Sequence, residues 1–211
     1  MFLSHFRPVV PQLPRAARTV STLSTNPKIK VFPLPGTGRY LLSYLEKWPP
    51  NAAIAIGTTS EVPPTPTSFK ENRRFIQIMN EVLAAHAQDD PGLQGQAQAF
   101  ASPGGFSFIQ ARSKRGTGTG AGGASAEGGA GGAGVGGWVH LSDARNPPDF
   151  GRIAWPEDIM GSVEVDGKGN IIGNYQPSGT YRIVTNQGIL GLSPFLTEKL
   201  ISRLRDEERK L

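Results

Sequence analysis

The fold is decided by residues 162–184, which read SVEVDGKGNIIGNYQPSGTYRIV. The first five of these residues alternate between polar and apolar, which is the period of a half-buried strand. Turn signals at 167–169 and 176–179 separate this strand from two further runs, at 170–174 and 180–184. Three short strands with tight connections predict an antiparallel meander.

A last helix is predicted after the meander. Ser193-Pro194 indicates its first turn, because proline suits the first position of a helix. Leu196, Leu200 and Leu204 then fall on one apolar stripe. The mixed charges of residues 203–210 indicate that the final turns project into solvent.

The most regular helical pattern lies before the meander. Ser68 and Glu71 have the spacing of a capping box, and the pattern ends near Ala87. The residues expected on its buried face are Phe75, Ile78, Met79, Val82 and Leu83.

Shorter segments precede this helix. Apolar residues at 41, 42 and 45 predict a helix over residues 39–47, and the small apolar run 51–57 predicts a buried strand. Helices and strands alternate early, whereas antiparallel strands gather late. We therefore expect an α+β fold with a mixed or mostly antiparallel sheet and two or three helices.

A glycine-rich run interrupts the chain. Residues 116–137 contain 12 glycines in 22 positions and a single charge. Such a run buries too little apolar area to offset the ordering of its backbone. Because strand character resumes at Trp138, we expect one domain over residues 21–211 with a disordered low-complexity insertion at 113–137. Two domains joined by this run are the alternative.

The N-terminus has the composition of a targeting segment. No acidic residue precedes Glu46, whereas Arg7, Arg15 and Arg18 lie among serines, threonines and scattered apolar residues. This pattern predicts a mitochondrial transit peptide over residues 1–20 and residence in the matrix. The alternatives are a plain basic tail or another organelle; a secretory signal lacks its long apolar core.

Composition excludes several classes of function. The chain has no cysteine, which excludes disulfides, thiolate catalysis and cysteine-ligated zinc or iron–sulfur sites. No run of 18 apolar residues predicts a transmembrane helix, although peripheral contact with the inner membrane is compatible with the sequence. Three arginines and no acid precede residue 21, so only +2 of the formal +5 belongs to the rest of the chain. That charge is ordinary.

Residues 138–158 concentrate the groups that could carry chemistry. If Val139 points into the core, His140 points away from it, and Asp143 could orient its ring. Asp149 and Glu157 lie close in sequence, so the candidate catalytic residues are His140, Asp143, Asp149 and Glu157. Their spacing matches no metal or triad signature, and surface ion pairs that fix an irregular loop are the simpler interpretation. The sequence predicts no metal and no cofactor.

The same block offers candidates for partner binding. Arg145, Arg152 and Trp155 lie in loops framed by prolines, and we interpret them as a surface for a protein partner. RNA is the alternative partner, since basic and aromatic residues can neutralise and stack on a single strand. The residues behind that alternative are Lys70, Arg73, Arg74, Phe106, Phe108, Arg112, Lys114, Arg115 and Trp138.

The stretch 138–166, centred on DARNPPDFGR at 143–152, resembles a block found in small mitochondrial proteins of filamentous fungi whose molecular function is unassigned. The resemblance covers about the last third of the chain and carries no catalytic residues. Together these observations favour a non-enzymatic matrix accessory or assembly protein of a larger complex, either the gene-expression machinery or a respiratory complex. An RNA-binding protein and a small enzyme using the His140/Asp143 loop are the alternatives.

Overall fold

The computed structural model describes residues 20–101, 136–148 and 152–210 of the 211 residues. Within these ranges the chain is an α+β fold with three α-helices and antiparallel strands, as the sequence predicts. The predicted transit peptide and glycine-rich insertion lie outside the described residues, except for Val20 and Gly136–Gly137.

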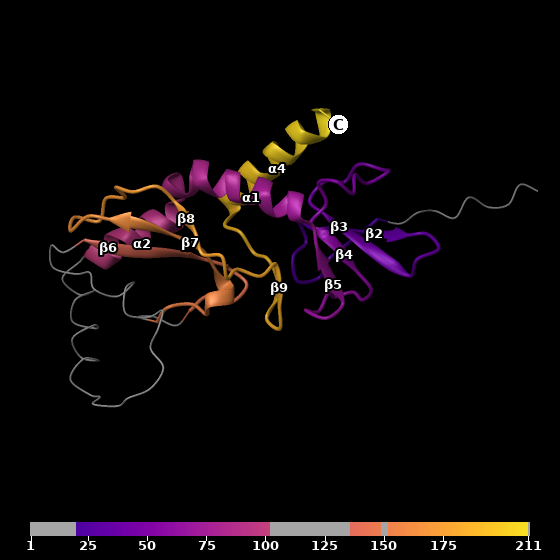
Figure 1. The fold of residues 1–211 in the computed structure, drawn as a ribbon, viewed down its shortest axis with the longest axis horizontal. Coiled ribbons are helices and arrows are strands. Elements are labelled where there is room, and N and C mark those ends of the chain that lie inside the picture. Colours follow the sequence, from indigo (N-terminus) through magenta and orange to yellow (C-terminus); the bar gives the residue numbers. More distant parts are fainter. Residues whose placement is uncertain (1–19, 102–135, 149–151, 211) are drawn as a thin grey trace, which may run out of the picture.

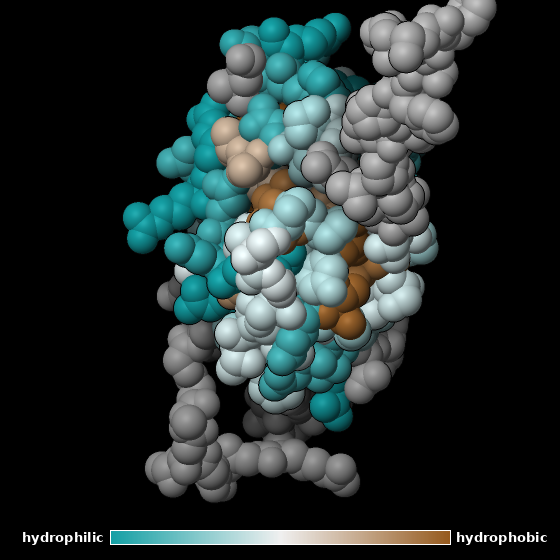
Figure 2. Space-filling model, turned by 90° about the vertical axis from the view of Figure 1, so that its right-hand side faces the viewer, coloured by the Kyte–Doolittle hydropathy of each residue, from teal (hydrophilic) through white to brown (hydrophobic). Residues whose placement is uncertain are grey.

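A five-stranded antiparallel sheet forms one side of the molecule (Figure 1), and Figure 2 views the molecule from that side. Its strands follow the chain order β1-β2-β3-β4-β5. Their bounds are Ser21–Thr22 (β1), Lys30–Leu34 (β2), Arg39–Ser43 (β3), Gly57–Thr59 (β4) and Phe69–Glu71 (β5).

Two smaller sheets lie in the C-terminal half of the chain. The three-stranded sheet has the order β6-β7-β8, and β9 pairs with β10 in a short hairpin. The bounds are Gly137–Ser142 (β6), Ile159–Val165 (β7), Gln176–Pro177 (β8), Val184–Thr185 (β9) and Gly188–Ile189 (β10).

Helices α1 (Arg73–His86) and α4 (Pro194–Lys210) pack against each other across the molecule, and α2 (Pro91–Ala101) packs beside β6 (Figure 1). One continuous core draws on these helices and on both larger sheets. A small second cluster of Phe32, Leu41 and Ala55 lies apart from it. No helix in the described ranges is long and apolar enough to cross a membrane.

The buried face of α1 is confirmed, but its cap is not. Phe75, Ile78, Met79, Val82 and Leu83 are its buried residues. The cap is Asn72, whose side-chain oxygen accepts from the Arg74 amide at 3.0 Å. Ser68 and Glu71 do not cap the helix, because Glu71 belongs to β5 and is paired with Gly57 of β4.

The prediction of a helix over residues 39–47 is wrong, because Arg39–Ser43 form strand β3. Gly36 and Gly38 have positive φ angles of 76° and 63°, which close a tight hairpin between β2 and β3. Leu42 belongs to the main core and Leu41 to the second cluster, so β3 is buried on both faces. Adjacent leucines on such a strand imitate helical spacing.

The strand predicted over residues 51–57 is also displaced. Ile54, Ala55 and Ile56 are buried as expected, but they form turns, and β4 begins only at Gly57. A Cβ on Gly57 would lie 2.3 Å from the Lys70 carbonyl oxygen, so only glycine permits the close approach of β5. Composition predicted that residues 54–56 are buried, but it did not predict that they form turns.

The predicted meander is present in altered form. Its first strand is part of β7, but residues 170–174 contribute only the bridge between Val165 and Ile171. Most of residues 180–184 lie outside strands, and the third strand is β8. The sheet is completed instead by β6, whose strand character at Trp138 was predicted.

Two helical ends also differ from expectation. Helix α4 begins as predicted, with the Ser193 hydroxyl accepting from the Leu196 amide at 3.1 Å, and its leucine stripe is buried. Its last turns do not all project into solvent, since Glu207 is only 7% exposed and binds Arg74 at 2.8 Å. Helix α2 was missed, although Asp90, which accepts from the Leu93 amide, is a regular cap.

Candidate functional site

A buried ion-pair network lies at the centre of the predicted block. The side chain of Arg145 is 3% exposed, and those of Asp143 and Asp158 are fully buried. Arg145 Nε donates to Asp158 Oδ1 at 2.8 Å, and its Nη1 lies 3.6 Å from Asp143 Oδ2. Strand β6 ends at this point, where the Asp143 amide donates to the Asp158 carbonyl at 2.8 Å.

The remaining donors of Arg145 bind backbone. Nη1 donates to the Ile183 carbonyl at 2.8 Å, and Nη2 donates to the carbonyls of Arg182 at 2.8 Å and Glu157 at 3.0 Å. The guanidinium also lies 5.4 Å from the ring centre of Tyr181. Its planar fork thus joins segments that are far apart in the sequence.

The carboxylate of Asp143 also accepts several hydrogen bonds from within the protein. Its oxygens accept from the Gly191 amide at 2.8 Å, the Arg145 amide at 2.8 Å and the Tyr181 hydroxyl at 2.7 Å. Burial raises the pKa of Asp143 above its ordinary value, although the Arg145 charge and these donors oppose the shift. Two carboxylates share one guanidinium here, so removal of that cation would leave buried negative charge without compensation.

Arg145 therefore cannot offer its side chain to a partner, which corrects the prediction made from the sequence. The guanidinium is enclosed, and within the described residues it donates to one carboxylate and three backbone carbonyls of the protein itself. Proline-framed arginines were expected on the surface because arginine is rarely buried. Arg145 is the exception because two acids and three carbonyl groups satisfy it.

The network holds an exposed tryptophan in place. Trp155 is 69% exposed, and the 3₁₀ turn η2 (Pro156–Asp158) follows it. The carbonyl of Trp155 accepts from the Asp158 amide at 2.8 Å, and that of Pro156 accepts from the Thr180 hydroxyl at 2.7 Å. The next carbonyl, at residue 157, accepts from Arg145 and from the Arg182 amide. Every carbonyl from 155 to 157 is thus bonded.

Neighbouring residues extend this exposed site. Ile153 is 41% exposed, and Arg152 is exposed beside it. Ala154, between Ile153 and Trp155, is 8% exposed and anchors the segment. We call residues 152–155 the Trp155 loop. Two of the three predicted partner-binding residues, Arg152 and Trp155, lie in it.

Within the described residues, no hydrogen bond joins His140 to the other predicted catalytic residues. His140 Nδ1 lies 2.7 Å from Ser162 Oγ on the neighbouring strand β7, and in the described chain no hydrogen bond joins His140 to Asp143 or Glu157. Glu157 is exposed, and Asp149 lies outside the described residues. Among the described residues no group of three or more histidine, aspartate or glutamate side chains could hold a metal ion.

The His140–Ser162 pair has the spacing of a base and a hydroxyl, and its burial has a consequence for stability. Desolvation lowers the pKa of His140 below its ordinary value of 6.5, so the unfolded chain takes up a proton first as the pH falls. We expect stability to decrease below about pH 6.5 until the folded-state pKa is reached. Urea unfolding at pH 7.5 and 5.5 measures this loss.

The control variants for this prediction replace one histidine at a time. His140→Gln should reduce the difference between the two pH values, whereas His86→Gln on α1 should retain it. An unchanged pH dependence in His140→Gln would show that burial of this ring does not cause the effect.

The basic residues expected to bind RNA are only partly described. Arg74 binds Glu207 at 2.8 Å, whereas Lys70 and Arg73 are exposed. Trp138 is half-buried on β6, and the predicted residues between 106 and 115 lie outside the described ranges. Of the residues behind the RNA alternative, only those at 70–74 and Trp138 are therefore placed by the structure.

Sequence reasoning missed Asp158 and Tyr181 as members of the network. Tyr181 is 38 positions from its partner Asp143, so no local spacing signals the contact. No family model matches the chain, and neither a curated protein nor a solved structure matches it. The geometry of the described residues is therefore the basis for the function proposed below.

Proposed function

We propose that this protein is a non-enzymatic accessory or assembly protein of the mitochondrial matrix, and that it docks on a larger complex through the Trp155 loop. The complex would be the gene-expression machinery or a respiratory complex. The observation that carries the proposal is Trp155, which is 69% exposed on a backbone whose carbonyls are all bonded.

In the unbound protein the apolar ring of an exposed tryptophan is in contact with water, which is unfavourable. Tryptophan is also among the residues that contribute most to the binding energy of protein interfaces. Ile153 adds apolar area beside it. Because the backbone is already fixed by Arg145, Thr180 and Asp158, docking would order few additional dihedral angles. A rigid aromatic anchor of this kind suits recognition of a protein better than turnover of a substrate.

The predicted transit peptide supports a location in the mitochondrial matrix. An acid-free, arginine-containing leader precedes residue 21, and import would deliver the folded part to the matrix. Mass spectrometry of the protein recovered from isolated mitochondria should give a mature N-terminus near Ser21. An intact Met1 on the mitochondrial protein would contradict the processing.

The docking role predicts a selective loss of partners. Trp155→Ala should reduce the recovery of co-purifying complex subunits at least tenfold in a mild pull-down, since anchors of this kind contribute 2 kcal/mol or more (about thirtyfold). Quantitative mass spectrometry against the unaltered protein gives the measurement.

Ile172→Ala is the matched control for this pull-down. Ile172 is 60% exposed in a different loop, so loss of its side chain should leave recovery unchanged. Circular dichroism should show both variants folded. Equal recovery of the same subunits by Trp155→Ala and the unaltered protein would refute the docking role.

A further inference from the structure

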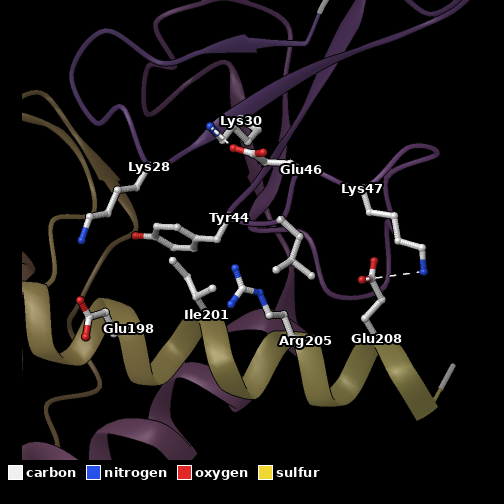
Figure 3. Close-up of a pocket in the computed structure, with 10 residues that line it drawn as sticks. Lys28, Lys30, Tyr44, Glu46, Lys47, Glu198, Ile201, Arg205 and Glu208 are labelled. Carbon is white, nitrogen blue, oxygen red and sulfur yellow. Dashed lines mark ion pairs between the residues drawn. The ribbon is translucent and has the colours of Figure 1, made fainter.

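A surface hollow lies between α4 and the residues that follow β3 (Figure 3). Its volume is about 540 Å³. Tyr44, Leu45 and Ile201 supply its apolar part. We call this hollow the α4 groove.

The charges around the α4 groove are unequally compensated. Glu46 pairs with Lys30 at 2.5 Å, and Lys47 lies 3.8 Å from Glu208. In the described chain no ion pair is formed by Lys28, Arg205 or Glu198, which also line the groove. Figure 3 shows the guanidinium of Arg205 beside the apolar residues in the middle of the groove, with Lys28 and Glu198 at one end.

Arg205 is the cation best placed for a ligand. It extends from α4 toward Tyr44 and Ile201, so a carboxylate bound to it would sit next to apolar surface (Figure 3). It also lowers the pKa of Glu46 through space, although hydrogen bonding from Lys30 is the larger cause. Its charge therefore acts within the groove, although Arg205 forms no ion pair with another described residue.

Tyr44 adds a second observation at the same place. Its ring lines the groove, the residue is 4% exposed, and its hydroxyl makes no hydrogen bond within the described chain. Burial raises the pKa of this hydroxyl, and the charge of Asp143 raises it further, whereas the Asn26 side chain lowers it. The Asn26 amide itself donates to the Leu190 carbonyl. A buried hydroxyl without a partner is costly, and native proteins keep few of them.

We propose that the α4 groove binds an extended segment of the partner protein that carries a carboxylate beside an apolar side chain. The proposal rests on the docking role above and gives it a second point of contact. The carboxylate would pair with Arg205, and the apolar side chain would lie on Leu45 and Ile201. From residue 198 to residue 208, α4 spans about 15 Å, which matches four to five extended residues.

The charge pattern selects a peptide over a polyanion. Glu46, Glu198 and Glu208 lie among the four cations of the groove, so the repeated negative charges of a nucleic-acid strand or an anionic lipid surface would meet carboxylates as well as cations. A peptide can place one carboxylate at Arg205 and neutral groups elsewhere. The ligand that we propose for the α4 groove is therefore a segment of a protein.

The test is an NMR titration of the full protein with two end-capped pentapeptides, Ala-Leu-Asp-Leu-Ala and Ala-Leu-Asn-Leu-Ala. The aspartate peptide should shift amide signals of residues 44–47 and 198–208 and bind at least tenfold more tightly than the asparagine peptide. Arg205→Glu should abolish this preference. Arg209→Glu, which reverses a charge on an exposed side chain one turn further along α4, should preserve it.

Three results would overturn the proposal: no shifts with the aspartate peptide, equal affinity for both peptides, or an unaltered preference in Arg205→Glu. Binding to phosphatidylglycerol vesicles that depends on Arg205 would assign the groove to a lipid instead. Failure here is distinguishable from failure of the docking role, because the pull-down with Trp155→Ala tests a different surface. Peptide binding with full recovery in that pull-down would refute the Trp155 anchor and keep the groove.

Discussion

Replacing Arg145 with methionine should lower the free energy of unfolding by about 3–5 kcal/mol. The variant removes the guanidinium that binds Asp158 and lies beside Asp143, and both carboxylates are fully buried. It also removes the donor to three backbone carbonyls, including that of Glu157. Urea denaturation followed by circular dichroism measures the loss.

The deficit of Arg145→Met should shrink as the pH falls. Burial already raises the pKa of Asp143, and without Arg145 the protonated carboxyl is favoured further. Protonation removes the buried negative charge that the cation compensated, so the two unfolding curves should approach each other toward acidic pH. Arg209→Met is the control, because its side chain is 78% exposed, and it should change stability by less than about 0.5 kcal/mol. A similarly small effect of Arg145→Met would refute the structural role of the network.

The same variant connects stability with the proposed docking role. Arg145 holds the Glu157 carbonyl, two residues after Trp155. At a temperature where Arg145→Met remains folded, the Trp155 loop should therefore be less ordered and the partner bound more weakly. Arg145 would then act on the interface by positioning Trp155, although it touches no partner itself.

The helices show what could be predicted from the sequence. The buried faces of α1 and α4 were readable because amphipathic spacing at period 3.6 is a local signal. Helix α2 was missed because it is rich in glycine, alanine and glutamine, and only Leu93 and Ala97 are buried in it. Its cap at Asp90 was the available sign.

The strands and the network show what could not be predicted. Strand β3 carries leucines into two separate clusters, and a pattern buried on both faces has no period to read. The contacts of Arg145 and Asp143 join residues up to 48 positions apart. Sequence spacing placed Arg145 in a loop correctly, but only the return of residues 181–191 to that loop makes it a buried residue.

Truncating Phe75 to alanine is the second large effect, and we expect a loss of about 3–5 kcal/mol in the free energy of unfolding. Phe75 is fully buried on α1, and its ring stacks on Tyr44 with centres 6.3 Å apart. Its removal would leave a cavity where α1 meets the five-stranded sheet, because close-packed neighbours relax only in part. Thermal and urea unfolding measure the change.

Two comparisons separate the cavity from other causes. Phe75→Leu keeps most of the apolar volume and should recover more than half of the loss, whereas Gln77→Ala, at an exposed position of the same helix, should cost less than about 0.5 kcal/mol. Since Tyr44 lines the α4 groove, Phe75→Ala should also change the amide signals of residues 44–47 in the absence of peptide. If Phe75→Ala cost no more than Gln77→Ala, α1 would not be packed through this ring, and the core that joins both larger sheets would need another centre.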